Sequence, residues 1–139
     1  MATKFFLCTT CGNVVVKVVD SGVDPVCCGQ DMKELVPGIS DGAKEKHLPV
    51  AEHLDGCTVK VKIGSEPHPM TLQHHISFIY LETEHGGTLK YLDPTGPAEV
   101  LICECKDKPV ALYAYCNIHG LWKTDLKDKC GTTCCKKEL

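Results

Sequence analysis

Short runs of alternating or purely apolar residues, separated by segments containing Gly and Pro, dominate the chain. Residues 58–63 alternate polar and apolar side chains and end at Gly64, which is the period of a half-buried β-strand. Further strands are expected at 76–82, 99–102 and 110–115, with turns at 84–87 and 93–97. Several short strands at this spacing predict an all-β domain of the sandwich type.

The first 36 residues carry a separate and smaller pattern. Residues 5–7 and 14–19 read as short strands, and Asp20-Ser21-Gly22 is a turn signal. So short a segment buries little apolar core, so a bound metal is expected to hold it together. Its exposed valine-rich edges favour pairing with a second subunit, which predicts a homodimer. The predicted organisation is a metal-held module at 1–36, a linker at 37–43, a sandwich domain at 44–126 and a Cys- and Lys-rich tail at 127–139.

Composition narrows the class of protein. The 139 residues suffice for one ordinary domain and a small module. The apolar runs are too short to span a membrane, and residues 1–4 lack the apolar stretch of a signal peptide, so a cytoplasmic protein is expected. The net charge is −3 and every basic residue is Lys, which argues against nucleic-acid binding, because that function normally uses a basic surplus with Arg.

Two cysteine pairs in the first module form a candidate metal site. Four thiolates suit zinc or a mononuclear iron, and the two-residue spacing of the first pair lets one turn present both sulfurs. The second pair is adjacent, so the backbone there must turn for both sulfurs to reach one metal. Gly12 and Gly29 follow the pairs and supply that freedom. A structural zinc knuckle remains the alternative at this stage. The candidate ligands are Cys8, Cys11, Cys27 and Cys28.

A second candidate site combines imidazoles with a thiolate. Such a set suits iron, copper, nickel or zinc, and five protein ligands are too many for a tetrahedral structural zinc. It fits a redox iron with one open position, although a buried structural thiol beside a core histidine is the simpler alternative for the Cys116 and His119 pair. The candidate ligands are His47, His68, His74, Cys116 and His119.

The other histidines and cysteines are expected to lie outside both sites. His74 and His75 are adjacent, so strand geometry would send them to opposite faces, and the spacing from His68 selects His74. His53 and His85 are expected in solvated loops. The remaining cysteines leave open a third metal site, a disulfide switch or free thiols. These cysteines are Cys57, Cys103, Cys105, Cys130, Cys134 and Cys135.

These motifs resemble a known family. The segment from Cys8 to Met32 is similar to desulforedoxin, and the segment from Lys44 to Lys123 is similar to the neelaredoxin domain of superoxide reductase. Together they resemble desulfoferrodoxin, the two-iron superoxide reductase, up to about Asp125. The matching motifs are Lys44-Glu45-Lys46-His47, His68-Pro69-Met70, His74 and Cys116-Asn117-Ile118-His119-Gly120.

The resemblance implies an immunoglobulin-like sandwich and a function. That function is one-electron reduction of superoxide to hydrogen peroxide at a ferrous site with four equatorial imidazoles, an axial Cys116 thiolate and an open sixth position. Lys46 would attract superoxide and Glu45 would occupy the open position afterwards. The four-cysteine iron would transfer electrons from a rubredoxin-like donor. The alternatives are a non-catalytic iron electron carrier or redox sensor, and a superoxide dismutase.

Overall fold

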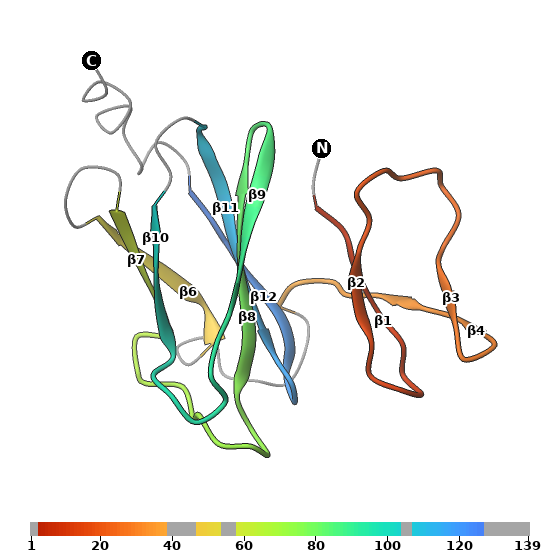
Figure 1. Ribbon diagram of the computed structural model, residues 1–139, viewed down its shortest axis with the longest axis horizontal. Coiled ribbons are helices and arrows are strands. Elements are labelled where there is room, and N and C mark those ends of the chain that lie inside the picture. The colour runs from red at the N-terminus through yellow and green to blue at the C-terminus, as the bar shows by residue number, and fades with distance from the viewer. Residues whose placement is uncertain (1–2, 39–46, 54–57, 104–106, 127–139) are drawn as a thin grey trace. The chain divides into compact units, whose positions relative to one another are not determined.

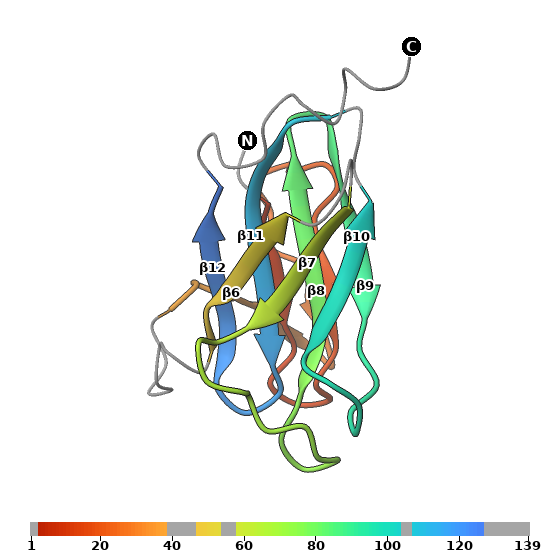
Figure 2. The ribbon, with the colours of Figure 1, turned by 90° about the vertical axis from the view of Figure 1, so that its left-hand side faces the viewer.

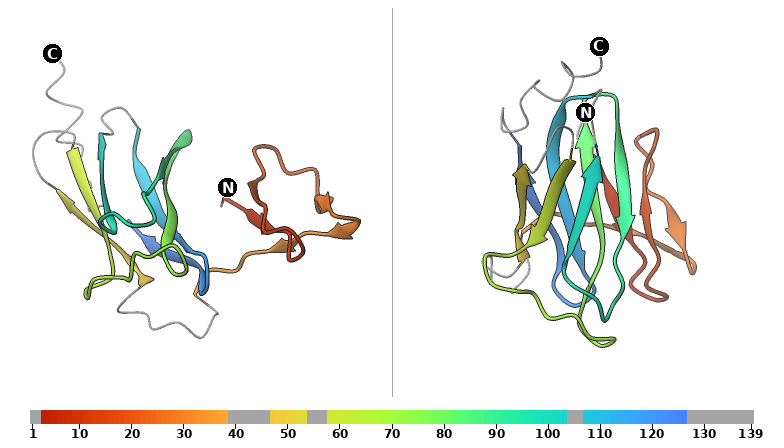
Figure 3. Two further views of the ribbon diagram at one scale, coloured as in Figure 1. Left: turned by 60° about the horizontal axis from the view of Figure 1, so that its bottom comes forward. Right: turned by 60° about the vertical axis from the view of Figure 1, so that its left-hand side comes forward.

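The computed structural model describes two compact units, Met1–Val36 and Pro37–Leu139. Within them, the residues whose placement is described are 3–38, 47–53, 58–103 and 107–126. Figures 1 and 3 show that the described residues of both units form strands joined by turns and loops. The described residues contain no helix long and apolar enough to cross a membrane.

The first unit is built from short strands around a very small core. A three-stranded antiparallel sheet has the order β2-β1-β5, and a separate hairpin joins β3 to β4. The core consists of Phe6, Cys8 and Met32, with Cys27 packed against it. One cysteine of each pair therefore contributes to the packing of the unit as well as to its candidate metal site. The strands are β1 (Phe5–Leu7), β2 (Val14–Val16), β3 (Val26–Cys27), β4 (Gln30–Asp31) and β5 (Lys33–Glu34).

The strand expected over residues 14–19 is shorter in the structure. Pairing with β1 ends where Val16 meets Phe5, and Val18 and Val19 remain 87% and 83% exposed. The chain then turns at Asp20, whose carboxylate accepts hydrogen bonds from the ammonium groups of Lys4 and Lys17 and from the Gly22 N–H. These contacts lower the pKa of Asp20, the Lys17 contact most strongly. The turn is therefore held by charge rather than by burial of valines.

The second unit is a sandwich of two antiparallel sheets, which confirms the predicted all-β class. One sheet has the order β10-β7-β6 and the other β12-β11-β8-β9, and Figure 2 shows the first sheet in front of the second. The first, second and fifth strands of the unit thus share one sheet, an arrangement of the immunoglobulin-like type. The strands are β6 (Pro49–His53), β7 (Thr58–Ile63), β8 (Ile76–Thr83), β9 (Gly86–Tyr91), β10 (Glu99–Cys103), β11 (Pro109–Cys116) and β12 (Gly120–Asp125).

Alternation in the strands creates the core between the sheets. On β7, every second side chain from Val59 to Ile63 is buried, and it faces residues such as Ile79 and Leu112 of the opposite sheet. Cys116 belongs to the same buried cluster and is fully inaccessible. One candidate metal ligand therefore lies at the end of the hydrophobic core, and the packing fixes its position.

The second unit differs from the sequence prediction at several points. The sequence pattern did not identify β6, β9 and β12. Gly86 and Gly87, expected in a turn, begin β9, and the turn consists of Glu84 and His85 alone. A side chain at Gly87 would collide with the ring of Tyr80, so this glycine is needed for close packing rather than for turning. His53, expected in a loop, ends β6 and pairs with Val59.

Candidate metal centres

The two cysteine pairs of the first unit sit on two tight turns. The first turn is closed by the Cys8 N–H donating to Asn13 O at 2.8 Å and by the Gly12 N–H donating to Cys8 O at 2.8 Å. Gly12 has φ +85°, which permits this close return. The second turn follows β3, where Cys28 itself has φ 54° and Gly29 has φ 74°. The backbone between Cys27 and Cys28 thus turns through left-handed conformations, as the adjacent pair requires.

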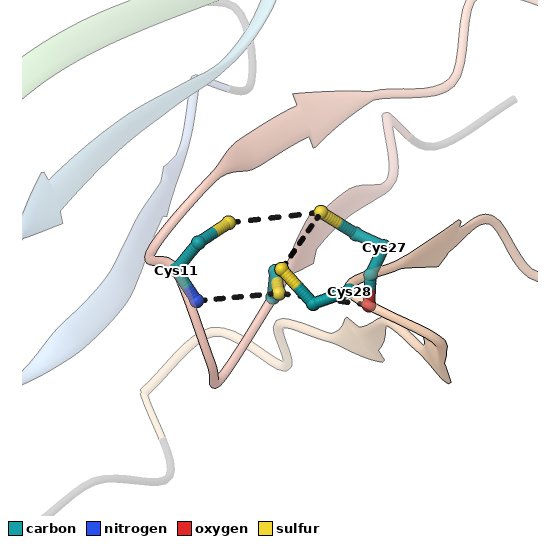
Figure 4. A group of neighbouring side chains, drawn as sticks. Cys11, Cys27 and Cys28 are labelled. Atoms are coloured by element: carbon teal, nitrogen blue, oxygen red, sulfur yellow. Dashed lines mark hydrogen bonds between the residues drawn. The ribbon is translucent and has the colours of Figure 1, made fainter.

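The turns bring four sulfurs together. The Sγ atoms of Cys11 and Cys27 are 3.6 Å apart and those of Cys27 and Cys28 are 4.0 Å apart (Figure 4). All four sulfurs, including that of buried Cys8, lie within 4.8 Å of one another. A tetrahedral thiolate site with metal–sulfur bonds of about 2.3 Å has sulfur–sulfur edges of about 3.8 Å. The spacing therefore fits a metal held by four sulfurs.

The pKa values of these thiols also favour the binding of a metal cation. The backbone N–H of Cys11 donates to the sulfur of Cys8 at 3.4 Å, and this contact lowers the pKa of Cys8 to about 6. Crowding against the sulfurs of Cys11 and Cys8 raises the pKa of Cys28 to about 12. One thiolate forms easily and opposes the ionisation of its neighbours, because like charges at this distance repel. A metal cation bound among the sulfurs offsets this repulsion and favours ionisation of all four thiols.

The second candidate centre lies at one end of the sandwich, where three segments meet. His47 lies two residues before the start of β6, and His68 and His74 lie in the connection from β7 to β8. Cys116 is the last residue of β11, and His119 lies in the three-residue turn to β12. Gly120 has φ 82° and pairs with Cys116, so the hairpin closes tightly. Figure 2 shows the β7–β8 connection and the β11–β12 turn at the same end of the sandwich.

The four imidazole rings form a closed square. Neighbouring ring centroids are 4.7 Å apart for His47 and His68, 4.8 Å for His68 and His74, 5.1 Å for His74 and His119, and 4.8 Å for His119 and His47. The diagonal from His47 to His74 is 6.5 Å. The Cys116 sulfur is 3.8 Å from Nδ1 of His119. Donor atoms of His47, His74, Cys116 and His119 all lie within 4.8 Å of one another, and His68 completes the square of rings.

Two ring nitrogens in this square show that a metal fits there. Nε2 of His68 and Nε2 of His74 are buried, and neither has a hydrogen-bond partner among the described residues. Nδ1 of His68 lies 2.7 Å from the Pro69 carbonyl, which only accepts, so Nδ1 carries the proton and Nε2 keeps its lone pair. Metal-bound histidines commonly hold their other nitrogen in this way. A buried lone pair without a donor is accounted for if a metal accepts it.

Burial also sets the protonation state of this centre. Desolvation lowers the pKa of His68 to about 4 and lowers that of His74, so both imidazoles are neutral and able to bind a metal. Burial raises the pKa of the Cys116 thiol, although the backbone N–H of His119 donates to its sulfur at 3.4 Å. The thiol therefore needs a bound cation to lose its proton at neutral pH.

The other histidines occupy different environments. His75 donates from Nδ1 to Thr71 O at 2.9 Å, away from the square. Both His74 and His75 precede β8, so the argument from strand parity was wrong and the loop itself separates them. His85 is in a turn, as expected, and its exposed ring pairs with Asp107 at 2.9 Å.

Several sequence-predicted residues lie outside the described part of the chain. This group includes both charges expected beside the second centre and most of the unassigned cysteines. Cys103 is described and lies exposed at the end of β10. The residues outside the described part are Glu45, Lys46, Cys57, Cys105, Cys130, Cys134 and Cys135.

Sequence reasoning missed two residues beside the second centre. Trp122 is 1% exposed and stacks on His47, and Asn117 joins the two loops that carry the ligands. Residues 120–125 do not alternate, and Leu121 and Trp122 are adjacent and both buried, so the pattern gave no signal for β12 or for the position of Trp122. No pattern in the sequence indicated the contacts of Asn117, because they link segments more than forty residues apart.

The fold and the two donor sets define a two-centre metalloprotein. The desulfoferrodoxin family model matches residues 39–125, and the model of the desulfoferrodoxin N-terminal domain matches residues 2–35. The chain belongs to the desulfoferrodoxin family. In a chain of this family, a four-cysteine set and a histidine–cysteine set are consistent with two iron centres.

Individual relatives cover most of the chain. The desulfoferrodoxin of Nitratidesulfovibrio vulgaris is 43% identical over 122 residues, which are 88% of this chain and 95% of that protein. The superoxide reductase of Pyrococcus abyssi is 40% identical over 105 residues, covering 63% of this chain and 90% of that protein. The crystal structure of the superoxide reductase from Treponema pallidum matches with a TM-score of 0.75 at 34% identity, covering 90% of this chain and all of that one.

Proposed function

We propose that this protein is a superoxide reductase, which reduces superoxide by one electron to hydrogen peroxide. The observation that carries the proposal is the square of four imidazoles closed on the buried sulfur of Cys116. The superoxide reductases of Treponema pallidum and Pyrococcus abyssi are 34% and 40% identical to this chain over the matched residues. Four imidazoles and a thiolate make five donors, one more than a tetrahedral structural zinc takes.

The proposed ligands of the second iron are His47, His68, His74, Cys116 and His119. Iron bound there supplies the electron for the reduction of superoxide, which takes up two protons to become hydrogen peroxide. The chain contributes a fixed donor set. His68 keeps its proton on Nδ1 against the Pro69 carbonyl and presents Nε2. The core holds the sulfur of Cys116 out of contact with water, so the thiolate remains a strong electron donor to the metal.

Two charged residues next to His47 are proposed to act on the substrate. Lys46 is a compact cation, and at the mouth of the site it would raise the encounter rate of an anion. A protein with a net charge of −3 does not attract superoxide at long range. Any electrostatic attraction of this anion must therefore come from positive charges near the site. Glu45 is proposed to occupy the open metal position after product leaves.

The first centre is proposed to transfer electrons. Its ligands are Cys8, Cys11, Cys27 and Cys28, and its sulfurs are partly exposed, which suits exchange with an external donor of the rubredoxin type. Residence in the cytoplasm and a homodimer formed through the valine-rich first unit stay predictions, as does the division at 1–36, 37–43, 44–126 and 127–139.

The peroxide yield tests the function. A known amount of superoxide is supplied to the two-iron protein, with and without a reductant, and hydrogen peroxide is measured. For a reductase, each superoxide consumed yields a peroxide, and sustained turnover requires the reductant. Dismutation would give half that yield and turnover without reductant. A non-catalytic carrier would leave the superoxide decay unchanged from that in buffer, and either result would refute the proposal.

A further inference from the structure

Asn117 lies in the turn between β11 and β12, and it hydrogen-bonds this turn to the connection between β7 and β8. These two loops carry most of the proposed ligands of the second centre. The backbone N–H of Asn117 donates to His75 O at 3.1 Å. Its side-chain Oδ1 accepts from the His75 N–H at 2.8 Å, and its Nδ2 donates to Gln73 O at 3.0 Å. One asparagine thus makes three hydrogen bonds to the segment on either side of His74. The side-chain amide acts like an additional peptide group placed against that segment.

The segment around His74 has its own internal closure. The Thr71 N–H donates to His74 O at 2.9 Å, and the His74 N–H donates to Thr71 O at 3.2 Å and to its Oγ1 at 3.0 Å. Both peptide groups of His74 are therefore used within the turn. The neighbouring peptide groups, Gln73 O and His75 N–H, are the ones that Asn117 holds. Closure within the turn sets its shape, and the asparagine connects it to the turn that carries Cys116 and His119.

We propose that Asn117 is a positioning residue that fixes His74 against Cys116 and His119. The inference rests on the ligand set proposed above and not on the chemistry performed there. Pairing between β11 and β8 shifts register after Tyr115, where Cys116 pairs with Ile76. Bulges of this kind redirect the end of a strand beside a site. Beyond that point Asn117 continues the connection between the two segments, so the distance between the rings of His74 and His119 depends on it.

The exposure of Asn117 separates this role from general stability. Asn117, Gln73 and the turn at Thr71 are all exposed to solvent. If the asparagine were removed, water would take its place at the freed peptide groups, so the fold should persist. The change should instead affect the position of the His74 ring relative to the other proposed ligands. Partners that orient metal ligands in this way typically contribute about 10–100-fold to metal affinity.

Metal release from the full-length protein tests the proposal, with cobalt(II) as the probe at both centres. The visible bands of the histidine–cysteine centre and of the four-cysteine centre are followed separately after a chelator is added. Asn117→Ala should release cobalt from the histidine–cysteine centre about 10-fold faster or more, and should alter its bands. Release from the four-cysteine centre should not change. Thermal unfolding of the metal-free variant should match the parent.

Two further variants sharpen the test. Asn117→Asp keeps the acceptor for the His75 N–H and loses the donor to Gln73 O, so its release rate should lie between parent and alanine variant. Gln73→Ala changes an exposed side chain in the same turn but keeps the carbonyl, and it should behave like the parent. If both Asn117 variants release cobalt at the parental rate with parental bands, the inference is overturned. If the parent's histidine–cysteine centre binds no cobalt, the proposed ligand set fails instead, and the inference fails with it.

Discussion

The indole of Trp122 stacks on the imidazole of His47, with ring centroids 4.9 Å apart and 20° between the ring planes. Trp122 is 1% exposed, and it is the only tryptophan in the chain. Its fluorescence therefore reports on the surroundings of His47 in the second centre. We expect binding of iron or cobalt there to quench the tryptophan emission strongly, because the metal would attach to the ring against which the indole lies.

The first centre provides the control for this fluorescence measurement. In Cys11→Ser protein the quenching should persist at the parental metal concentration, since Cys11 belongs to the four-cysteine set and Trp122 stacks on His47 of the second centre. In His47→Ala protein it should weaken. Equal quenching in the parent and the His47 variant would show that the emission does not sense this centre.

Replacing the thiolate tests its proposed role as a ligand. Cys116→Ser exchanges a soft, strongly donating anion for a poor ligand in a fully buried position. We expect the thiolate-to-metal absorption of the second centre to disappear. Reductase activity should fall by at least about 10-fold, because changes to the partners of ligands alone cost that much. Spectra and stopped-flow reduction of superoxide measure both effects. A variant with parental spectrum and rate would make Cys116 a structural thiol.

The sequence predicted local geometry better than contacts between segments. The turn at Cys27 and Cys28 followed from the adjacency of the two residues, and the structure has φ 54° there. The alternation of residues 58–63 placed β7 correctly. By contrast, residues 49–53 and 86–91 alternate weakly, and they become edge strands because one neighbouring strand, β7 or β8, supplies hydrogen bonds. Tertiary pairing overrides weak propensity in such segments.

At the candidate site, too, the sequence predicted the ligands better than the contacts that position them. Motif order gathered its histidines and cysteine from segments far apart in the chain, whereas spacing alone leaves each one ambiguous. Strand parity was the argument that only one of His74 and His75 reaches the metal, and it does not apply, because β8 begins only at Ile76. The spacing from His68 selected His74. What separates His74 from His75 is the hydrogen bonding at Thr71 and Asn117, which depends on the folded loop. Such contacts leave no periodic signal in a single sequence.

Buried histidines give the metal-free protein a pH-dependent stability. Desolvation holds the pKa of His68 at about 4 in the folded state, against 6.5 for the ordinary group. Below pH 6.5 the unfolded chain binds a proton that the folded protein excludes, so stability falls as the pH drops toward 4 and is constant below it. The loss is on the order of 3 kcal/mol for this residue. Urea unfolding of metal-free protein at several pH values measures it.

A His68→Gln variant identifies the source of that loss. It removes the titrating group, so its stability should depend less on pH in the same window. Bound metal should also suppress the dependence at the upper end of the window, because it binds only the neutral imidazole. Identical pH profiles for the parent and the variant, both metal-free, would assign the effect to other groups.

The neighbouring glycines of β9 provide a matched pair for a packing test. A Cβ at Gly87 would collide with the phenol ring of Tyr80, whereas nothing lies within 4 Å of one at Gly86. Gly87→Ala should therefore destabilise the protein by about 1–3 kcal/mol through overpacking. Gly86→Ala should change the free energy of unfolding by much less. Denaturant unfolding of the two variants compares them, and equal effects would mean that Tyr80 moves aside without cost.

The separation of the two centres leads to the last prediction. Cys11 is exposed, and its sulfur lies 3.6 Å from that of Cys27, so Cys11→Ser should remove a ligand of the first centre without disturbing the core of the second unit. We expect elemental analysis to show the loss of one of two irons per chain. Reduction of superoxide by the pre-reduced second iron in a single turnover should be retained. Cys103→Ser changes an exposed cysteine outside both sets and should keep both irons. If the single-turnover reaction vanished in Cys11→Ser protein while the second iron stayed bound, the first centre would be obligatory for the chemistry, and the proposed division of roles would be wrong.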